Sequence, residues 1–191
     1  MGAEKALLPW PPQVAGQPPS KDCFLSAAIR SMSLSTDFVV VVAAANEREL
    51  APVVYASGAS LVVNPEPGRG QFSSLQLGLG EVLNRGRDAA VVTLVDRPPA
   101  KSATVETLRA AFEAAPQNIW AVVPEFSGQH GHPFITGREL IEAFLRAPAT
   151  ANARDIEHQH QANIQYVAVD DPFVALNVNT PEEYAGLLAK S

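Results

Sequence analysis

Cysteine is almost absent from the sequence, because Cys23 is the only one among 191 residues. A single cysteine excludes an intrachain disulfide and a cysteine metal cluster, and it fits the reducing conditions of the cytoplasm. Runs of lysine or arginine are also absent and the net charge is -6, so we expect no binding of nucleic acid. Because no apolar run is long enough to cross a bilayer, we expect no membrane contact either.

The sequence does contain a regular alternation of apolar, β-branched runs with segments of helical spacing. The runs predict strands and the intervening segments predict helices, so consecutive strands would be joined by helical crossovers. A length of 191 residues suits one domain with a sizeable core. We therefore expect a single α/β domain over residues 1–191 with a mostly parallel sheet. The expected strands are 38–44, 60–64, 89–96, 119–124, 164–169 and 175–178, and the expected helices are 20–32, 46–55, 73–83, 101–115, 138–146 and 181–190.

The run AAVVTLVDRPP, residues 89–99, is the stretch that points most directly to chemistry. Its unbroken apolar part predicts a strand buried on both faces, as in parallel sheets. Asp96 stands at the carboxyl end of this strand, where open α/β sheets form their ligand crevices. The alternative for such an acid is a helix cap or a turn residue, and the strand alone does not decide between the two.

Two helix starts are marked in the sequence. Ser73 or Ser74 is the expected N-cap of the helix that follows a Gly-rich loop. Thr180, with Pro181 next and Glu183 three residues after the cap, predicts a capping box for the last helix.

Four segments in chain order form a wider pattern, namely MGAEKALLPW, NPEPGRGQFSSLQLGL, LVDRPP and GQHGHPF. The weaker patterns ANARD and NVNTPEEY follow near the C-terminus. In this order and spacing the set resembles the MobA-like NTP transferases, the family of molybdenum-cofactor cytidylyl- and guanylyltransferases. The resemblance covers nearly the whole chain.

The resemblance implies a Rossmann-like, three-layer nucleotidyltransferase fold and the transfer of CMP or GMP from CTP or GTP to molybdopterin with Mg²⁺ or Mn²⁺. It also implies a molybdoenzyme or its chaperone as a further partner. Mg²⁺ prefers oxygen ligands and keeps several waters, so one carboxylate and one other side-chain oxygen suffice. By motif position, the expected metal ligands are Asp96 and Asn179, the catalytic residues Asp96 and Lys5, the nucleotide contacts Gly68, Gly70, Ser73 and Ser74, and the acceptor contacts His132 and Arg154.

Plainer interpretations stay open beside these. Lys5 is also interpretable as a surface lysine, the Gly-rich loop as a solvated turn, and Asn179 as a turn residue before a helix. A sugar phosphate or another small phosphorylated compound is an alternative acceptor. A catalytically degenerate module that binds a nucleotide or a protein partner is the alternative to an enzyme.

The sequence departs from the family pattern in two places. The family's first strand and its AAGxSxR loop precede the position of Met1 and Gly2, so either the true start lies upstream or the loop has been lost. Without that strand, its neighbours in the sheet would have unpaired backbone groups, each costing roughly 1–3 kcal/mol. Arg97 also replaces the glutamine that the family usually carries after the strand-end aspartate.

Overall fold

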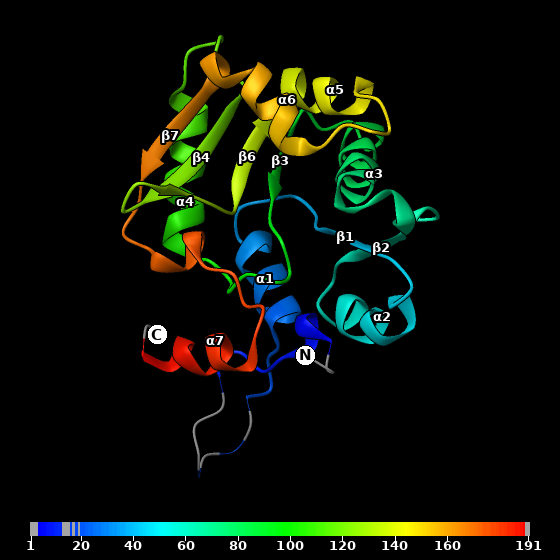
Figure 1. Ribbon diagram of the computed structural model, residues 1–191, viewed down its shortest axis with the longest axis vertical. Coiled ribbons are helices and arrows are strands. Elements are labelled where there is room, and N and C mark those ends of the chain that lie inside the picture. Colours follow the sequence, from blue (N-terminus) through cyan, green and yellow to red (C-terminus); the bar gives the residue numbers. More distant parts are fainter. Residues whose placement is uncertain (1–3, 13–15, 17, 19, 190–191) are drawn as a thin grey trace.

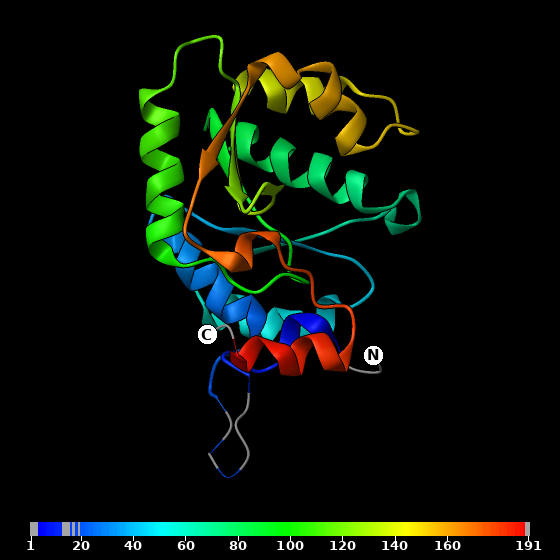
Figure 2. The same ribbon diagram turned by 60° about the vertical axis from the view of Figure 1, so that its left-hand side comes forward.

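The computed structural model describes residues 4–12, 16, 18 and 20–189, and its central feature is a five-stranded sheet with helices on both faces. Helix α4 lies on one face, and helices α3, α5 and α6 lie on the other (Figures 1 and 2). The strands are β1 (Val40–Ala43), β2 (Ser60–Val63), β3 (Ala89–Val92), β4 (Ala121–Phe126), β5 (Gln129–His130), β6 (Phe134–Gly137) and β7 (Ile164–Ala168). The α-helices are α1 (Phe24–Ser33), α2 (Glu47–Ala56), α3 (Gln71–Asn84), α4 (Ser102–Ala114), α5 (Arg138–Arg146), α6 (Ala153–Gln159) and α7 (Pro181–Gly186). Short 3₁₀ helices are η1 (Lys5–Leu7), η2 (Pro67–Arg69), η3 (Gln161–Asn163), η4 (Pro172–Ala175) and η5 (Leu187–Ala189).

The alternation of side chains along β4 explains why the sheet carries two helical layers. Ala121 and Val122 are consecutive and both fully buried, so they face opposite sides of the sheet. Ala121 packs into a core with residues of α3, α5 and α6. Val122 packs with Leu108 of α4 and Ile135 of β6 on the other side. This three-layer arrangement confirms the predicted α/β class.

The strand directions are less uniform than expected. β1 pairs with β2 in parallel and β4 with β7 in parallel, but β6 runs antiparallel to both β3 and β4. The mostly parallel sheet is therefore only partly present. β6 and α6 were not predicted, and the strand expected at 175–178 is wrong, because this segment ends the 3₁₀ helix η4 and continues without strand pairing.

The strands form two separate sheets, and β3 is the edge strand of the larger one. β1 and β2 form a separate two-stranded sheet, and within the described part of the chain β1 has no second partner strand and β3 pairs only with β6. A groove of about 1080 Å³ lies between these two strands. The predicted strand from Ala89 to Asp96 is too long and too buried, since β3 ends at Val92 and its residues are exposed or half-buried. The ladder with β6 stops at the pair Val92 and Phe134, the first residue of β6, so the segment from Thr93 onward is unpaired.

Helix starts agree with the sequence at one end of the chain and differ in the middle. Thr180 Oγ1 accepts from Glu183 N at 3.2 Å, and the Glu183 carboxylate accepts from Thr180 N at 3.0 Å, which confirms the predicted capping box. α3 begins earlier than expected, at Gln71, and its N-cap is Gly70 instead of a serine. Gly70 has a φ of 86°, a conformation that a residue with a Cβ rarely adopts.

A fully buried carboxylate joins the C-terminal segment to α4. Asp171 accepts hydrogen bonds from Lys101 N at 2.9 Å and from Thr104 Oγ1 at 2.8 Å, so it caps the first turn of the helix. It also accepts from Phe173 N at 3.1 Å, at the start of η4. These bonds fix the position of the next residue, Val174, which the pocket described below depends on. Among the helices of the described ranges, each is too short or too polar to cross a lipid bilayer.

Candidate functional site

Asp96 lies in the turn that follows β3, and the structure places it close to the C-terminal segment. Its carbonyl oxygen accepts a hydrogen bond of 2.9 Å from Val178 N. One of its carboxylate oxygens, Oδ1, is buried and has no hydrogen-bond partner among the residues described. A buried oxygen left unpaired costs roughly 1–3 kcal/mol. A cation or a donor group of a ligand at this oxygen would remove that cost.

Lys5 reaches the same region from the N-terminal side. Its Nζ donates a hydrogen bond of 2.9 Å to Oδ1 of Asn179. Because Asn179 directly follows Val178, the bond between Val178 and Asp96 keeps Asn179 beside the Asp96 turn. Three residues predicted to act together thus converge from three separate segments. The Asn179 oxygen is engaged by the lysine, so a metal ion bound to that oxygen would have to displace the ammonium group.

The groove between β1 and β3 is the cavity into which these side chains open. Lys5, Ser74 and Asp96 all line it, together with apolar residues of α1, α3 and the two strand edges. Glu4, Lys5 and Asp96 give the groove charged walls beside an apolar length, which suits a ligand with a charged part and a less polar part.

The Gly-rich loop divides into residues near the groove and residues away from it. Gly68 and Gly70 are exposed, have open space where a Cβ would stand, and do not line the groove. Ser73 turns inward, donating to Gly70 O at 2.8 Å and accepting from Asn64 Nδ2 at 2.8 Å. Ser74, which also accepts from Asn64 Nδ2 at 3.0 Å, faces the groove, as does Gln71 at the start of α3. Buried Asn64 therefore holds the two serines in place.

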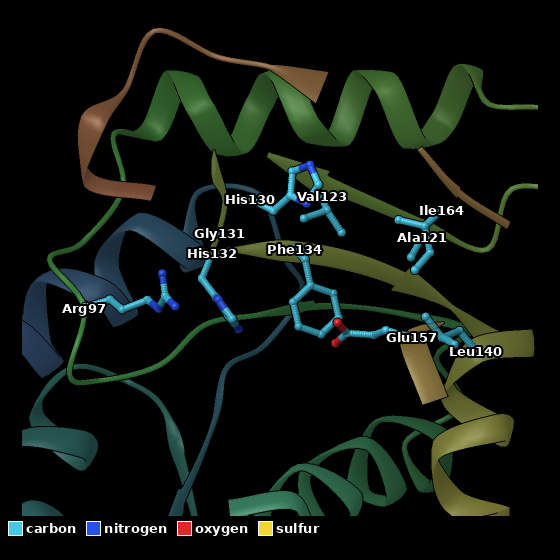
Figure 3. Close-up of a pocket in the computed structure, with 10 residues that line it drawn as sticks. All are labelled: Arg97, Ala121, Val123, His130, Gly131, His132, Phe134, Leu140, Glu157 and Ile164. Atoms are coloured by element: carbon cyan, nitrogen blue, oxygen red, sulfur yellow. The ribbon is translucent and has the colours of Figure 1, made fainter. Parts of the chain in front are cut away.

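A second, smaller cavity lies beside the Asp96 turn. Nη1 of Arg97 donates to the Val174 carbonyl oxygen at 3.0 Å, and the backbone N of His132 donates to the same oxygen at 2.9 Å. Both side chains line a pocket of about 130 Å³, and the Arg97 guanidinium points toward His132 (Figure 3). Arg97 Nε and His132 Nδ1 are buried and lack hydrogen-bond partners in the described structure. Two unpaired polar atoms thus lie buried in the wall of this pocket.

The charges in this pocket are set by burial. Burial lowers the pKa of the Arg97 guanidinium, and the carboxylate of Asp96 opposes this. The guanidinium stays charged at neutral pH all the same. Burial, with a smaller contribution from the Arg97 charge, lowers the pKa of His132 to about 3. His132 is therefore a neutral imidazole at pH 7.

The depressed pKa of His132 predicts a loss of stability in acid. Below about pH 6.5 the unfolded chain takes up a proton on this imidazole, whereas the folded chain does so only near pH 3. Its contribution to the free energy of unfolding is complete above pH 6.5 and falls by up to about 1.4 kcal/mol per unit as the pH decreases. Urea unfolding at pH 7, 5 and 4 measures this slope. His132→Gln should flatten it, and the exposed control His158→Gln should leave it unchanged; equal slopes in all three proteins would contradict the assignment.

The other predicted acceptor contact, Arg154, does not line this pocket. It lies on α6 with an exposed side chain. His130 does line the pocket, and its ring stacks on Tyr166 with centroids 3.8 Å apart. His130 Nε2 also lies 3.1 Å from a carboxylate oxygen of Glu125. His130 is thus held at the pocket's edge by contacts with β4 and β7.

The side-chain oxygens of Asp96 and Asn179 are ligands that suit a hard divalent cation better than a transition-metal cluster. Within the ranges that the structure describes, no group of three or more His, Cys, Asp or Glu side chains is placed to hold a metal ion. Asp96 has an unpaired carboxylate oxygen, and Asn179 supplies an amide oxygen nearby. Mg²⁺ and Mn²⁺ accept such oxygen ligands and complete their shells with water and substrate phosphates.

Comparison with known protein families identifies the family of this chain. The model of the MobA-like NTP transferase domain matches residues 1–164. The chain is a member of the MobA-like NTP transferase family. Among curated protein sequences, none matches the chain.

Solved structures agree with this family at the level of the fold. Rv0371c from Mycobacterium tuberculosis H37Rv is similar with a TM-score of 0.78 and 23% identity, over 99% of this chain and 90% of that one. A complex of the same protein with manganese has a TM-score of 0.75 and 21% identity, over 98% and 92% of the two chains. Molybdopterin-guanine dinucleotide biosynthesis protein A from Archaeoglobus fulgidus has a TM-score of 0.62 and 18% identity, over 89% and 87%. The MobA-like chain therefore has the fold of nucleotidyltransferases.

Sequence reasoning missed two features of the small pocket in this MobA-like chain. Glu157, whose side chain lines the pocket, lies on the helix α6 that was not predicted. Gly131 packs directly on the Val174 carbonyl, and a Cβ there would lie 1.7 Å from that oxygen. The glycine before His132 was visible in the motif, but the segment that it contacts is 43 positions further along the chain and could not be inferred.

Proposed function

We propose that the protein is a Mg²⁺-dependent nucleotidyltransferase that moves CMP or GMP from an NTP to a molybdopterin-type acceptor. One observation carries the proposal: consecutive residues open to different cavities, Asp96 to the large groove and Arg97 to the small pocket. A transferase must hold a donor and an acceptor side by side. The two cavities are lined by consecutive residues at this turn, and also at Phe134 and Ile135 of β6, which face opposite sides of the sheet. Membership of the MobA-like family supports the same reaction class.

The groove is the proposed donor site. Lys5 is a mobile point charge suited to phosphate oxygens, and it needs only to leave Asn179 to reach them. Ser74 is the loop residue positioned to contact the nucleotide, with Gly68, Gly70 and the inward-facing Ser73 shaping the loop behind it. Asp96 and Asn179 would hold the divalent cation. Such an ion supplies neutralisation of the triphosphate charge.

The small pocket is the proposed acceptor site. Transfer is an in-line displacement in which an acceptor phosphate oxygen bonds to the α-phosphorus and pyrophosphate leaves. The reaction needs positioning and charge neutralisation and no covalent intermediate on the protein. Arg97 and His132 would hold the acceptor on the side of Asp96 away from the groove. Arg154, exposed on α6, would contact a part of the acceptor that extends out of the pocket.

The test is a titration of the full chain with CTP and with GTP, each with and without Mg²⁺ or Mn²⁺, followed by assay of pyrophosphate release with a molybdopterin acceptor. Metal-dependent binding of one nucleotide and acceptor-dependent pyrophosphate release are expected. Nucleotide binding that ignores the metal, or a folded chain that binds neither nucleotide, would contradict the proposal.

Lys5→Ala should weaken NTP binding roughly tenfold, because one charge-assisted contact with the triphosphate is lost. Calorimetric titration with the preferred NTP measures the dissociation constant. Lys21→Ala removes an exposed lysine that does not line the groove and serves as the matched control. If both variants bind as the parent chain does, Lys5 has no role at the phosphates.

A phosphorylated small alcohol is the second candidate acceptor. A 4-diphosphocytidyl-2C-methyl-D-erythritol synthase from Anaerococcus prevotii shares the fold with a TM-score of 0.67 at 11% identity, over 93% of this chain and 87% of that one. Turnover with a sugar or polyol phosphate in place of molybdopterin would favour this candidate. Turnover only with a molybdopterin would reject it.

A further inference from the structure

Asn64 is a buried side chain directly after β2, and its hydrogen bonds lead to the loop and the helix beside the groove. It is 5% exposed, and its backbone N donates to Ala43 O at 2.8 Å, at the end of β1. Its Oδ1 accepts from Glu66 N at 2.9 Å. Its Nδ2 donates to Ser73 Oγ at 2.8 Å and to Ser74 Oγ at 3.0 Å. The strand end therefore fixes the place of Asn64, and its amide group fixes the two serine hydroxyls.

The contact with Glu66 determines which way the Asn64 amide group faces. A backbone N–H can only donate, so the atom beside Glu66 N must be the oxygen Oδ1. The amino nitrogen then faces the serines, with one of its two hydrogens for each hydroxyl oxygen. Both serine oxygens are therefore acceptors toward Asn64.

The two serines differ in where their own hydroxyl hydrogens go. Ser73 Oγ donates to Gly70 O at 2.8 Å, and the same carbonyl accepts from Ser73 N at 3.2 Å. A carbonyl one turn back is the usual acceptor for a serine in a helix, so for Ser74 this acceptor is already taken. Among the residues described by the structure, the Ser74 hydroxyl hydrogen has no acceptor. Since Ser74 is half-buried and lines the groove, this hydrogen is directed there.

We infer that Asn64 is a positioning residue that fixes the Ser74 hydroxyl as a hydrogen-bond donor toward the groove, and that the nucleotide meets it with an acceptor. The inference rests on the proposed function, in which the groove holds the NTP. Phosphate, ribose and base-carbonyl oxygens and an unprotonated ring nitrogen are such acceptors. An amino group of the base is rejected at this point, because two donors would face each other and stay unpaired. Asn64 itself does not line the groove, so it acts only through Ser74.

A double-mutant cycle on the full chain separates this role from mere support of the loop. Asn64→Asp at pH 8 reverses the hydrogen bond, because a carboxylate can only accept and the Ser74 hydrogen then turns to it and away from the groove. Asn64→Asp and Ser74→Ala are made singly and together, and calorimetric titration with CTP and with GTP in the presence of Mg²⁺ measures each dissociation constant. Ser74→Ala should weaken NTP binding roughly tenfold, the effect of one strong hydrogen bond. Asn64→Asp should weaken it roughly tenfold more in the parent chain than in Ser74→Ala, because the added negative charge acts equally in both and cancels in the comparison.

Asn163→Asp is the matched control for the cycle. It makes the same change at an asparagine that lines neither cavity and donates to Asn118 O at 2.7 Å. Its effect on NTP binding should be the same in the parent chain and in Ser74→Ala. Equal effects of Asn64→Asp in these two backgrounds would overturn the inference, because Asn64 would then only support the loop.

Hydrogen exchange of the Asn64 side-chain amide, followed by NMR without nucleotide, tests the orientation even if Asn64→Asp does not fold. Both amide hydrogens should exchange more slowly than in the urea-unfolded chain, and in Ser74→Ala one of them should exchange roughly tenfold faster. Exchange of both at the rate of the unfolded chain, or no change in Ser74→Ala, overturns the inference. If the exchange is as expected but neither NTP binds the parent chain, the orientation of Ser74 stands and the proposed function fails.

Discussion

Asp96→Ala should reduce the rate of NTP-dependent pyrophosphate release by roughly a thousandfold, the upper range for loss of one group that stabilises developing charge. The expected cause is local. Asp96 Oδ1 is the buried, unpaired carboxylate oxygen at the junction of the two cavities, and its loss removes the anionic ligand for the metal ion. The fold should persist, because the contact that ties this turn to the C-terminal segment uses the backbone oxygen of Asp96, which alanine retains.

Two further variants make the Asp96 result specific. Asp96→Asn keeps the shape and one oxygen but removes the charge, so it should lose most of the activity as well and should require higher Mg²⁺ concentrations for what remains. Asp170→Ala removes an exposed acid near the C-terminal segment and should retain activity. Thermal unfolding of each protein shows whether it is folded. Full turnover in folded Asp96→Ala would remove Asp96 from the mechanism.

The parts of the fold that could be predicted are those with local physical signals. Helix α5 was predicted over 138–146 and has these bounds, because a strongly amphipathic segment is followed by Pro148. The capping box of Thr180 and Glu183 depends on four adjacent positions and was confirmed. Chemical type and short-range spacing suffice for such features.

Features set by distant contacts were not predictable in the same way. β6 has four residues and ends at Gly137, so it is too short to show a strand period, and its place between β3 and β4 is decided by tertiary pairing. The early end of β3 likewise follows from a distant contact, because its ladder with β6 stops at Phe134. For the site, the motifs placed Lys5, Asp96 and Asn179 in one region, and the structure brings them together, but that Lys5 bonds to Asn179 across 174 positions was not visible in either segment.

Gly131→Ala should be the most damaging single methyl group that can be added near the site. The new Cβ would lie 1.7 Å from the Val174 oxygen and 2.5 Å from its carbonyl carbon, both backbone atoms, so the two segments must separate. The same oxygen accepts hydrogen bonds from His132 N and Arg97 Nη1, and both bonds would be strained or lost. We expect the free energy of unfolding to fall by about 3 kcal/mol, the upper part of the range for overpacking.

Urea unfolding measures this loss, and Gly80→Ala is its matched control. Gly80 lies inside α3, has open space where the Cβ would be, and should gain up to about 1 kcal/mol because alanine favours helix. The two substitutions add the same atom, so their difference isolates the contact with Val174. If Gly131→Ala remains folded, its NTP affinity should be retained while acceptor-dependent pyrophosphate release is lost, because Gly131 lines the small pocket and not the groove. Equal stability of the two variants would show that the Val174 carbonyl can move away at little cost in free energy. Its hydrogen bonds would then not fix the positions of Arg97 and His132.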